Sequence, residues 1–189
     1  MGSRIHDGPQ PEQVILVDES DRPVGAIEKM AAHRQALLHR AFSVFIFNSR
    51  GEMLLQQRAP EKYHSAGLWT NACCSHPRPG EDTREAALRR LQEELGFTTV
   101  LEKLFEFTYR TAYDNGLTEF EFDHVFVGTY DRDISPDRAE VSDYRYQSLP
   151  EIEAELHSAP DRFTSWFQLA FPMIKEKIGQ LSAYSQRFS

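Results

Sequence analysis

The chain has 189 residues, 40% of them apolar and 26% charged, which is typical of a single globular domain with its own hydrophobic core. A formal net charge of −8 argues against a surface for nucleic acid, and no apolar run approaches membrane-spanning length. The polar start lacks the apolar core of a signal peptide, so the sequence predicts a cytoplasmic protein. We expect residues 1–12 to be a mobile segment and residues 13–189 to form one domain.

The first third of the chain predicts three strands. Residues 14–18 (VILVD) predict a short strand, and residues 18–25 (DESDRPVG) predict a turn after it. Residues 27–40 are compatible with a helix or a loop. A strongly β-prone run follows at residues 41–48, and a hairpin turn then leads into another strand at residues 53–58.

The clearest helix lies at residues 82–95, after a turn-rich stretch at residues 70–81 (TNACCSHPRPGE). Asp82 is a good N-cap, the leucines of this segment recur on one face, and Gly96 occupies a position where helices end. These three signals agree, so both the existence and the bounds of this helix are predicted.

The second half predicts two long strands and a helical tail. Residues 104–130 form the strands, with the hairpin signal Asp-Asn-Gly at residues 114–116. The tail, residues 149–185, predicts helices broken by Pro160 and Pro172. Because strands and helices do not alternate regularly, we expect an α+β fold, an α/β sandwich with a mixed or antiparallel sheet flanked by helices.

Cys73 and Cys74 are the only cysteines, and they are neighbours. A disulfide between adjacent residues is strained, so both thiols are expected to be free, as suits a reducing cytosol. Both could be small buried hydrophobic residues. Their place in a turn-rich stretch, beside His76, favours a chemical role instead.

Glu119 and Glu121 lie two apart on a predicted strand, so their carboxylates share one face of the sheet. Their mutual repulsion would be removed by a cation. Imidazoles could supply the remaining ligands of a Zn or Mn ion, and the candidates are His33, His39 and His76. The alternative is an ordinary strand with its acidic side in water.

A second acidic group lies on the predicted helix, where Glu93 and Glu94 follow Glu81. Oxygen ligands on a rigid helix suit a Mg²⁺ ion that is shared with substrate phosphates. The alternative is a solvated helix face stabilised by an Arg90–Glu94 pair. Basic side chains that could clamp a phosphate, or be plain surface charges, are Lys29, Arg58 and Lys62.

Residues 75–97 resemble a degenerate Nudix box. Seven positions fit the pattern, namely Glu81, Arg89, Leu91, Glu93, Glu94, Gly96 and Phe97. Ser75 stands where the box has glycine, and Arg90 stands where it has an acid. The missing acid argues against diphosphate hydrolysis, because hydrolases of this family use the acids of the helix to hold metal and activate water.

The surrounding segments make the resemblance more specific. EKMAAH, LLHRAFSVFIFN, QQRAPEKYHSAGLWTN, TNACCSHP, FTYRTAYDNGLTEFEF and FTSWFQLAFP occur in an order that resembles type I isopentenyl-diphosphate delta-isomerases, which have the Nudix fold. The resemblance covers nearly all of the chain after the first dozen residues. It implies one Nudix-fold domain over residues 13–189 that acts on a small diphosphate, as a monomer or weak homodimer.

The resemblance also implies roles for individual residues. Cys74 and Glu121 match the catalytic pair, with Tyr109 as an active-site tyrosine and Trp166 over the hydrocarbon end of the substrate. A divalent Mn²⁺ or Zn²⁺ ion would be held by His33, His39, His76, Glu119 and Glu121. A Mg²⁺ ion would be held by Glu94, the main-chain carbonyl of Cys74 and the diphosphate, which Lys29, Arg58 and Lys62 would contact. Cys73 matches a position without a catalytic role.

The reaction implied is the conversion of isopentenyl diphosphate to dimethylallyl diphosphate through a carbocation-like state, by protonation and deprotonation. It needs an acid and a base on opposite sides of a dry pocket. Two alternatives remain: a Nudix hydrolase of a nucleoside or prenyl diphosphate, and an inactive Nudix module that binds a partner protein. A hydrolase has no need of Cys74, and an inactive module would be expected to have lost metal ligands.

Overall fold

The computed structural model describes residues 12–62 and 64–186, with side chains described as far as residue 180. The segment expected to be mobile, residues 1–12, lies outside this part except for its last residue. Among the described residues, no helix combines the length and the apolar character needed to span a membrane. In chain order the elements are β1 (Gln13–Val17), β2 (Pro23–Glu28), α1 (Lys29–Gln35), β3 (His39–Phe47), β4 (Met53–Arg58), β5 (Trp69–Thr70), β6 (Cys73–Ser75), α2 (Thr83–Leu95), β7 (Glu102–Ala112), β8 (Thr118–Thr129), β9 (Val141–Gln147), α3 (Leu149–Ser158), a 3₁₀ turn (Pro160–Arg162) and α4 (Ser165–Gln186).

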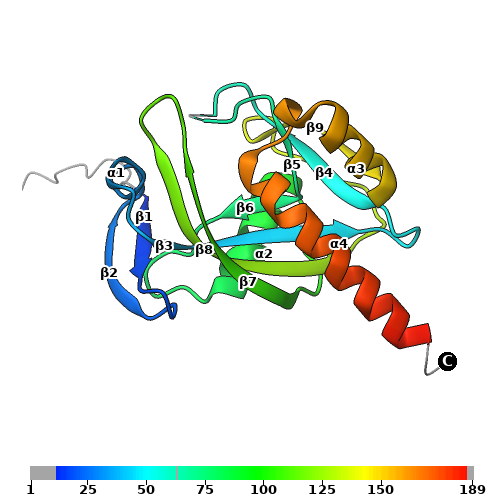
Figure 1. The fold of residues 1–189 in the computed structure, drawn as a ribbon, viewed down its shortest axis with the longest axis horizontal. Coiled ribbons are helices and arrows are strands. Elements are labelled where there is room, and N and C mark those ends of the chain that lie inside the picture. Colours follow the sequence, from blue (N-terminus) through cyan, green and yellow to red (C-terminus); the bar gives the residue numbers. More distant parts are fainter. Residues whose placement is uncertain (1–11, 63, 187–189) are drawn as a thin grey trace, which may run out of the picture.

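Strand β3 is the centre of a mixed sheet (Figure 1). Along one edge it pairs in parallel with β8 over its whole length, from His39 opposite Glu121 to Phe47 opposite Thr129. Its other edge pairs antiparallel with β1, then β6, then β4. The predicted mixed sheet with flanking helices is therefore confirmed.

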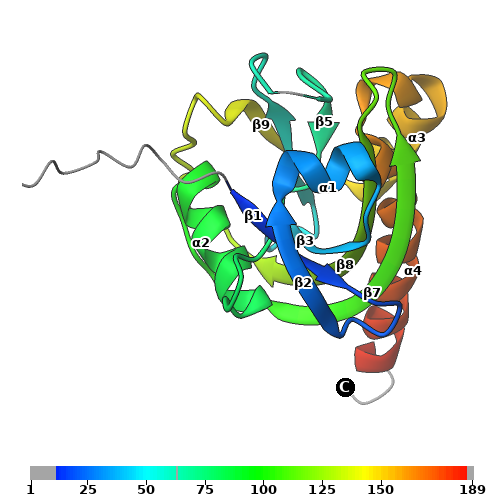
Figure 2. The ribbon, with the colours of Figure 1, turned by 90° about the vertical axis from the view of Figure 1, so that its left-hand side faces the viewer.

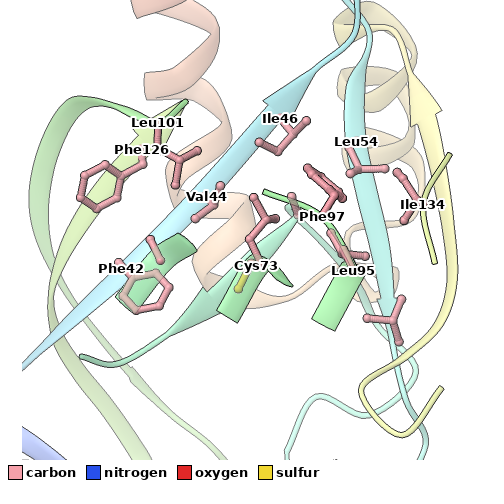
Figure 3. Close-up of a cluster of buried hydrophobic side chains, with 14 of the residues drawn as sticks. Phe42, Val44, Ile46, Leu54, Cys73, Leu95, Phe97, Leu101, Phe126 and Ile134 are labelled. Atoms are coloured by element: carbon pink, nitrogen blue, oxygen red, sulfur yellow. The ribbon is translucent and has the colours of Figure 1, made fainter. Parts of the chain in front are cut away.

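The two faces of this sheet bury different groups of side chains. Phe42, Val44 and Ile46 point to one face, where α2 packs on them together with Cys73 (Figure 3). Phe45 and Phe47 point to the other face, toward α3 and α4. Figure 2 shows α2 and α4 on opposite sides of the strands. Because each such side chain is almost wholly buried, its burial is worth roughly 1.5–3 kcal/mol.

The predictions of helix α2 and of two hairpins are confirmed. Asp82 caps α2 by accepting hydrogen bonds from the backbone amides of Arg84 and Glu85, and Gly96 ends it in the left-handed conformation. Strands β3 and β4 flank one turn, and β7 and β8 flank the turn at residues 114–116. Local signals were strong at each of these places, and the tertiary structure agrees with them.

The predictions fail at places where non-local contacts decide. The turn predicted at residues 18–25 already contains the start of β2, which pairs with β1. The stretch expected to be turn-rich contains the last residue of β5 and the whole of β6, and β6 is a strand because it pairs with β3. Strand β9 was not predicted, and it forms by pairing with β4.

Pro172 does not break the last helix, contrary to prediction. Proline inside a helix costs about 3 kcal/mol. The face of α4 that packs on the sheet buries Trp166, Phe167, Phe171 and Ile174. At roughly 1.5–3 kcal/mol for each buried side chain, this packing outweighs the cost of the proline.

Gly96 and Gly116 offer a matched test of the close approach at the end of α2. Both have positive φ, 77° and 80°, but a Cβ at Gly96 would lie 2.5 Å from the backbone oxygen of Ser135, whereas a Cβ at Gly116 would have no heavy atom within 4 Å. Gly116→Ala should therefore lower the free energy of unfolding by only about 1–2 kcal/mol, the cost of holding a residue other than glycine in the left-handed conformation. Gly96→Ala should lower the free energy of unfolding by clearly more, and urea unfolding of the two variants measures the difference. Equal losses for the two variants would contradict this account of the α2 terminus.

Candidate active site and metal centre

One face of the sheet carries most of the chemically distinctive side chains. In the register of the strands, His39 lies opposite Glu121, Ser43 opposite Cys74, and Tyr109 opposite Glu121. Because alternate residues of a strand share a face, these side chains all point to the same side of the sheet. The residues that line the cavity there are Lys29, Arg58, Lys62, His64, Cys74, Ser75, His76, Arg90, Glu94, Tyr109, Glu119, Glu121 and Trp166.

The structure brings together the twelve residues to which the resemblance assigned a catalytic or binding role, whereas Cys73 lies in the core, and Glu81 and Glu93 pair with Arg89 outside the cavity lining. Ten of them line the cavity directly: Lys29, Arg58, Lys62, Cys74, His76, Glu94, Tyr109, Glu119, Glu121 and Trp166. The other two, His33 and His39, form a cluster with His76 and Glu121 in which one ligand atom of each lies within 4.8 Å of all the others. Their chemical roles stay predictions.

The cluster of His33, His39, His76 and Glu121 is buried and its orientation is fixed from outside. The Nδ1 atoms of His33 and His39 donate to the backbone oxygens of Lys29 and Leu37, at 2.7 and 2.8 Å. Their Nε2 atoms therefore carry the lone pairs in the neutral rings. His39 Nε2 lies 3.2 Å from His76 Nε2, which in turn lies 2.9 Å from a carboxylate oxygen of Glu121.

The electrostatics of this cluster fit a divalent cation. Burial lowers the pKa of His76 to about 4 and lowers the pKa of His33, so both rings are neutral at pH 7. Burial would raise the pKa of Glu121, but hydrogen bonds from His39 and His76 outweigh it and hold that pKa well below its usual range. Without a cation, ring nitrogens and a carboxylate in such contact must share protons. A metal ion would satisfy every one of these electron pairs.

Glu119 lies beside the cluster and is held by different partners. Its carboxylate accepts hydrogen bonds from Tyr113 at 2.7 Å and from Tyr109 at 3.2 Å, and it lies 3.1 Å from His64 Nε2. Tyr109 also donates to Glu121, at 2.6 Å. Burial, followed by the charges of the two glutamates, raises the pKa of Tyr109 well above its usual value, so its hydroxyl remains a donor.

The two cysteines face opposite sides of β6. Cys73 is fully buried in the core beneath α2 (Figure 3), whereas Cys74 lines the cavity. The sulfur of Cys74 lies 3.1 Å from Asn71 Oδ1 and 3.3 Å from Ser43 Oγ. Burial, and then the nearby Asp123, raises the pKa of the Cys74 thiol, which is therefore protonated at neutral pH.

Another wall of the cavity carries Glu94 together with Arg90, Lys62 and Glu140. Arg90 donates to one oxygen of Glu94 at 2.7 Å, which bears out the pair considered from the sequence, and Gln56 donates to the other oxygen at 3.1 Å. Glu140 forms ion pairs with both Lys62 and Arg90. Mg²⁺ is usually held by one or two carboxylates together with substrate phosphates, so Glu94 could hold a magnesium ion that an anionic ligand shares, while the cations nearby contact that ligand.

Several residues at this site were not found from the sequence. Arg90 was noted as a departure from the Nudix box and as a helix-surface partner of Glu94, but not as a residue that lines the cavity. His64, Tyr113, Ser43, Asn71 and Asp123 carry no local signal, because partners distant in the sequence bring them here.

A roomier groove of about 570 Å³ lies between α3 and α4, lined in part by Leu156, Phe171 and Pro172. Of the titratable side chains on its walls, Lys175 is paired with Glu153. It is separate from the cluster of histidines and carboxylates. The chemistry therefore points to the smaller, more polar cavity.

Comparisons with known proteins agree with this geometry. Residues 37–167 match the NUDIX domain family. A protein of Pectobacterium atrosepticum named isopentenyl-diphosphate Delta-isomerase is 54% identical over 166 residues, which cover 87% of this chain and 92% of the relative. A Burkholderia multivorans protein of the same name is 50% identical, over 82% of this chain and 89% of the relative.

Solved structures support the fold alone. A Deinococcus radiodurans crystal structure superposes with a TM-score of 0.73 at 20% identity, covering 86% of this chain and 98% of that one. A MutT protein from Methanosarcina mazei superposes with a TM-score of 0.62 at 22% identity, covering 74% of this chain and 94% of that one.

The histidine cluster predicts metal binding that depends on His39. His39→Ala removes one of four converging ligand atoms, so affinity for a transition-metal ion should fall about tenfold or more. Metal content after dialysis, measured by mass spectrometry, should show one tightly held ion in the parent chain and little in the variant. His157→Ala, on the exposed side of α3, is the matched control and should retain the ion. Equal retention by both variants would contradict the assignment of the cluster.

Proposed function

The chain belongs to the Nudix family and, within it, to the isopentenyl-diphosphate Delta-isomerases, and from this premise we propose that Cys74 and Glu121 are the pair that moves protons in its reaction. The reaction shifts the double bond of isopentenyl diphosphate to give dimethylallyl diphosphate. No atom is gained or lost overall. One proton joins the alkene at one end, and another leaves two carbons away.

The observation that carries the proposal is the contrast between the two side chains. Both line one cavity, where burial keeps the thiol of Cys74 protonated and the neighbouring histidines keep Glu121 ionised. One group can therefore give a proton while the other takes one. A site built this way moves protons and does not need an attacking water.

Tyr109 and Trp166 complete the hydrocarbon side of the site in this proposal. Tyr109 donates to Glu121 at 2.6 Å and so orients the carboxylate. Trp166 is almost wholly buried while still lining the cavity. The face of its ring attracts a developing positive centre, which is worth about 2 kcal/mol in a desolvated site.

The diphosphate serves to position the alkene. Lys29, Arg58 and Lys62 line the cavity together with Glu94, and Arg90 adds a further cation. We infer that Glu94 and the main-chain carbonyl of Cys74 hold a Mg²⁺ ion against the diphosphate. Binding energy from this charged end fixes the reacting carbons between acid and base.

We infer that the histidine cluster holds Mn²⁺ or Zn²⁺, with Glu119 as a further ligand beside His33, His39, His76 and Glu121. A mixed set of imidazole and carboxylate ligands suits these ions. When bound, such an ion increases the acidity of groups on its ligands. The chain's own contribution is to hold Glu121 at the cavity wall through His76 and Tyr109.

Hydrolysis of a diphosphate receives less support. Arg90 stands where the Nudix box has an acid, and it pairs with Glu94. Position 90 therefore lacks the carboxylate with which hydrolases of this family hold a further metal ion and activate water, whereas Glu94 remains as a ligand for one Mg²⁺ ion. We further propose that the protein works in the cytoplasm as a monomer or weak homodimer, without nucleic acid or a membrane as partner, in keeping with its net charge of −8.

The cysteine pair provides an internal control for the proposed mechanism. Cys74→Ala, and separately Glu121→Gln, should lower kcat for isopentenyl diphosphate about 10²- to 10⁴-fold, as expected for loss of a proton-transferring group. Cys73→Ala should stay within about threefold of the parent kcat, because its sulfur faces the core.

Turnover should be followed by NMR of the alkene protons, with folding of each variant checked by circular dichroism. A Cys74→Ala variant that turns over as fast as Cys73→Ala would remove the thiol from the mechanism. Retained turnover by Glu121→Gln would remove the carboxylate.

A further inference from the structure

A cluster of buried polar side chains lies beside Cys74 and does not belong to the lining of the cavity. Ser43 comes from β3, Asn71 from the connection between β5 and β6, and Asp123 from β8. Their exposed fractions are 2%, 0% and 1%. Buried polar groups are costly unless hydrogen bonds satisfy them, so packing alone does not explain three of them at one place.

Ser43 joins the other members of this cluster. Its hydroxyl donates to Asp123 Oδ2 at 2.6 Å, and its oxygen lies 3.3 Å from the sulfur of Cys74. The register of β3 and β6 places Ser43 directly opposite Cys74, so the two side chains are neighbours on one face of the sheet. The second oxygen of Asp123 is buried with no hydrogen-bond partner among the described residues, a cost that a purely structural position would avoid.

Asn71 fixes the other side of the sulfur. Its amide nitrogen donates to the backbone oxygens of Val44 and Cys73, at 3.0 and 2.9 Å. Both amide protons are thereby used, which turns Oδ1 toward Cys74 at 3.1 Å. The Asn71 oxygen accepts a hydrogen bond from the thiol, whereas the Ser43 hydroxyl can turn its single proton from Asp123 to the sulfur.

We propose that Ser43, anchored by Asp123, is a positioning residue that holds the sulfur of Cys74 at the cavity wall. The single proton of its hydroxyl lies toward Asp123 while Cys74 carries its own proton, and it turns to the sulfur once the proton of Cys74 has moved to the substrate. Asn71 restricts the position of the sulfur from the other side through its Oδ1 atom. The proposal rests on the role proposed above for Cys74. It concerns the chemical step, because none of the three residues lines the cavity or contacts the groups assigned to the diphosphate.

Ser43→Ala tests this with a split between kcat and KM. We expect kcat to fall about ten- to hundredfold, since small misplacement of a reacting group has effects of this size. KM, and the inhibition constant of inorganic pyrophosphate, should stay within about twofold, because the cationic wall is unchanged. Ser43→Thr keeps the hydroxyl and should recover most of the lost kcat.

Ser49→Ala is the matched control. Ser49 lies just beyond the other end of β3 and donates to Asp131 at 2.8 Å, so the variant deletes a similar serine–aspartate hydrogen bond away from the cavity. Its kcat should equal that of the parent chain. Asp123→Leu is the second variant in case Ser43→Ala folds poorly: it replaces the buried carboxyl by an apolar group of similar size, and kcat should again fall about tenfold while the melting temperature is maintained.

The rate at which iodoacetamide alkylates Cys74, read by mass spectrometry, separates a positioning role from a structural one. The Ser43→Ala variant lacks the hydroxyl that can donate to the thiolate, so its alkylation should be slower at a fixed pH. If Ser43 only supported packing, its loss would loosen the site and speed alkylation. Faster alkylation, or an unchanged kcat together with unchanged alkylation, would overturn the proposal.

Slower alkylation with unchanged kcat would support the positioning of the sulfur and would remove Cys74 from the mechanism. A Cys74→Ala variant that retains turnover would have the same meaning. Failure of the proposed function is thereby distinguished from failure of this inference.

Discussion

The pairing of β3 with β6 on one edge and with β8 on the other is the constraint on which the site depends. Because side chains alternate along a strand, this register assigns each residue to the core or to the cavity. Cys73 and Cys74 show the consequence: one sulfur lies beneath α2 in the apolar core, and the next lies in the cavity. A shift of β6 by one residue would exchange them. The same register puts His39 beside Glu121, on strands that come from distant parts of the chain.

Burial gives the site its chemical character. Water is largely excluded, so each group is governed by its immediate partners. In the part of the chain that the structure describes, no cation is in hydrogen-bond contact with Cys74, which stays protonated, whereas Glu121 is held by histidines and by Tyr109 and stays ionised. Two groups with opposite tendencies can thus coexist on one sheet face. Although the net charge of the chain is −8, the cavity carries a local group of cations, and the proposed function assigns the diphosphate to them.

The sequence was informative where the signal was local or where a motif was complete. Asp82 and Gly96 defined α2, and the spacing of Glu119 and Glu121 put both carboxylates on one face. It was less informative where pairing over long distances decides structure, as in β9 and in the strand that contains Cys74. Pro172 is an opposite case, since a strong local signal was overridden by the burial of its neighbours.

The residues of the site show the same contrast between local signals and contacts over long distances in the sequence. Residues that carry ligands or charge could be found from the segments in which they occur. Ser43, Asn71 and Asp123 could not, because a serine in a β-prone run is distinguished only by a sulfur 31 positions later in the chain. Positions that support a reacting group through hydrogen bonds are therefore visible in the structure and not in the sequence.

The central claim is that the site exchanges protons with the alkene and leaves the diphosphate whole. Incubating the chain with isopentenyl diphosphate and Mg²⁺ in deuterated water tests it most directly, with the product examined by mass spectrometry. The account predicts deuterium in the hydrocarbon part of dimethylallyl diphosphate and no phosphate release. Phosphate or a monophosphate ester released with the alkene unchanged would contradict it.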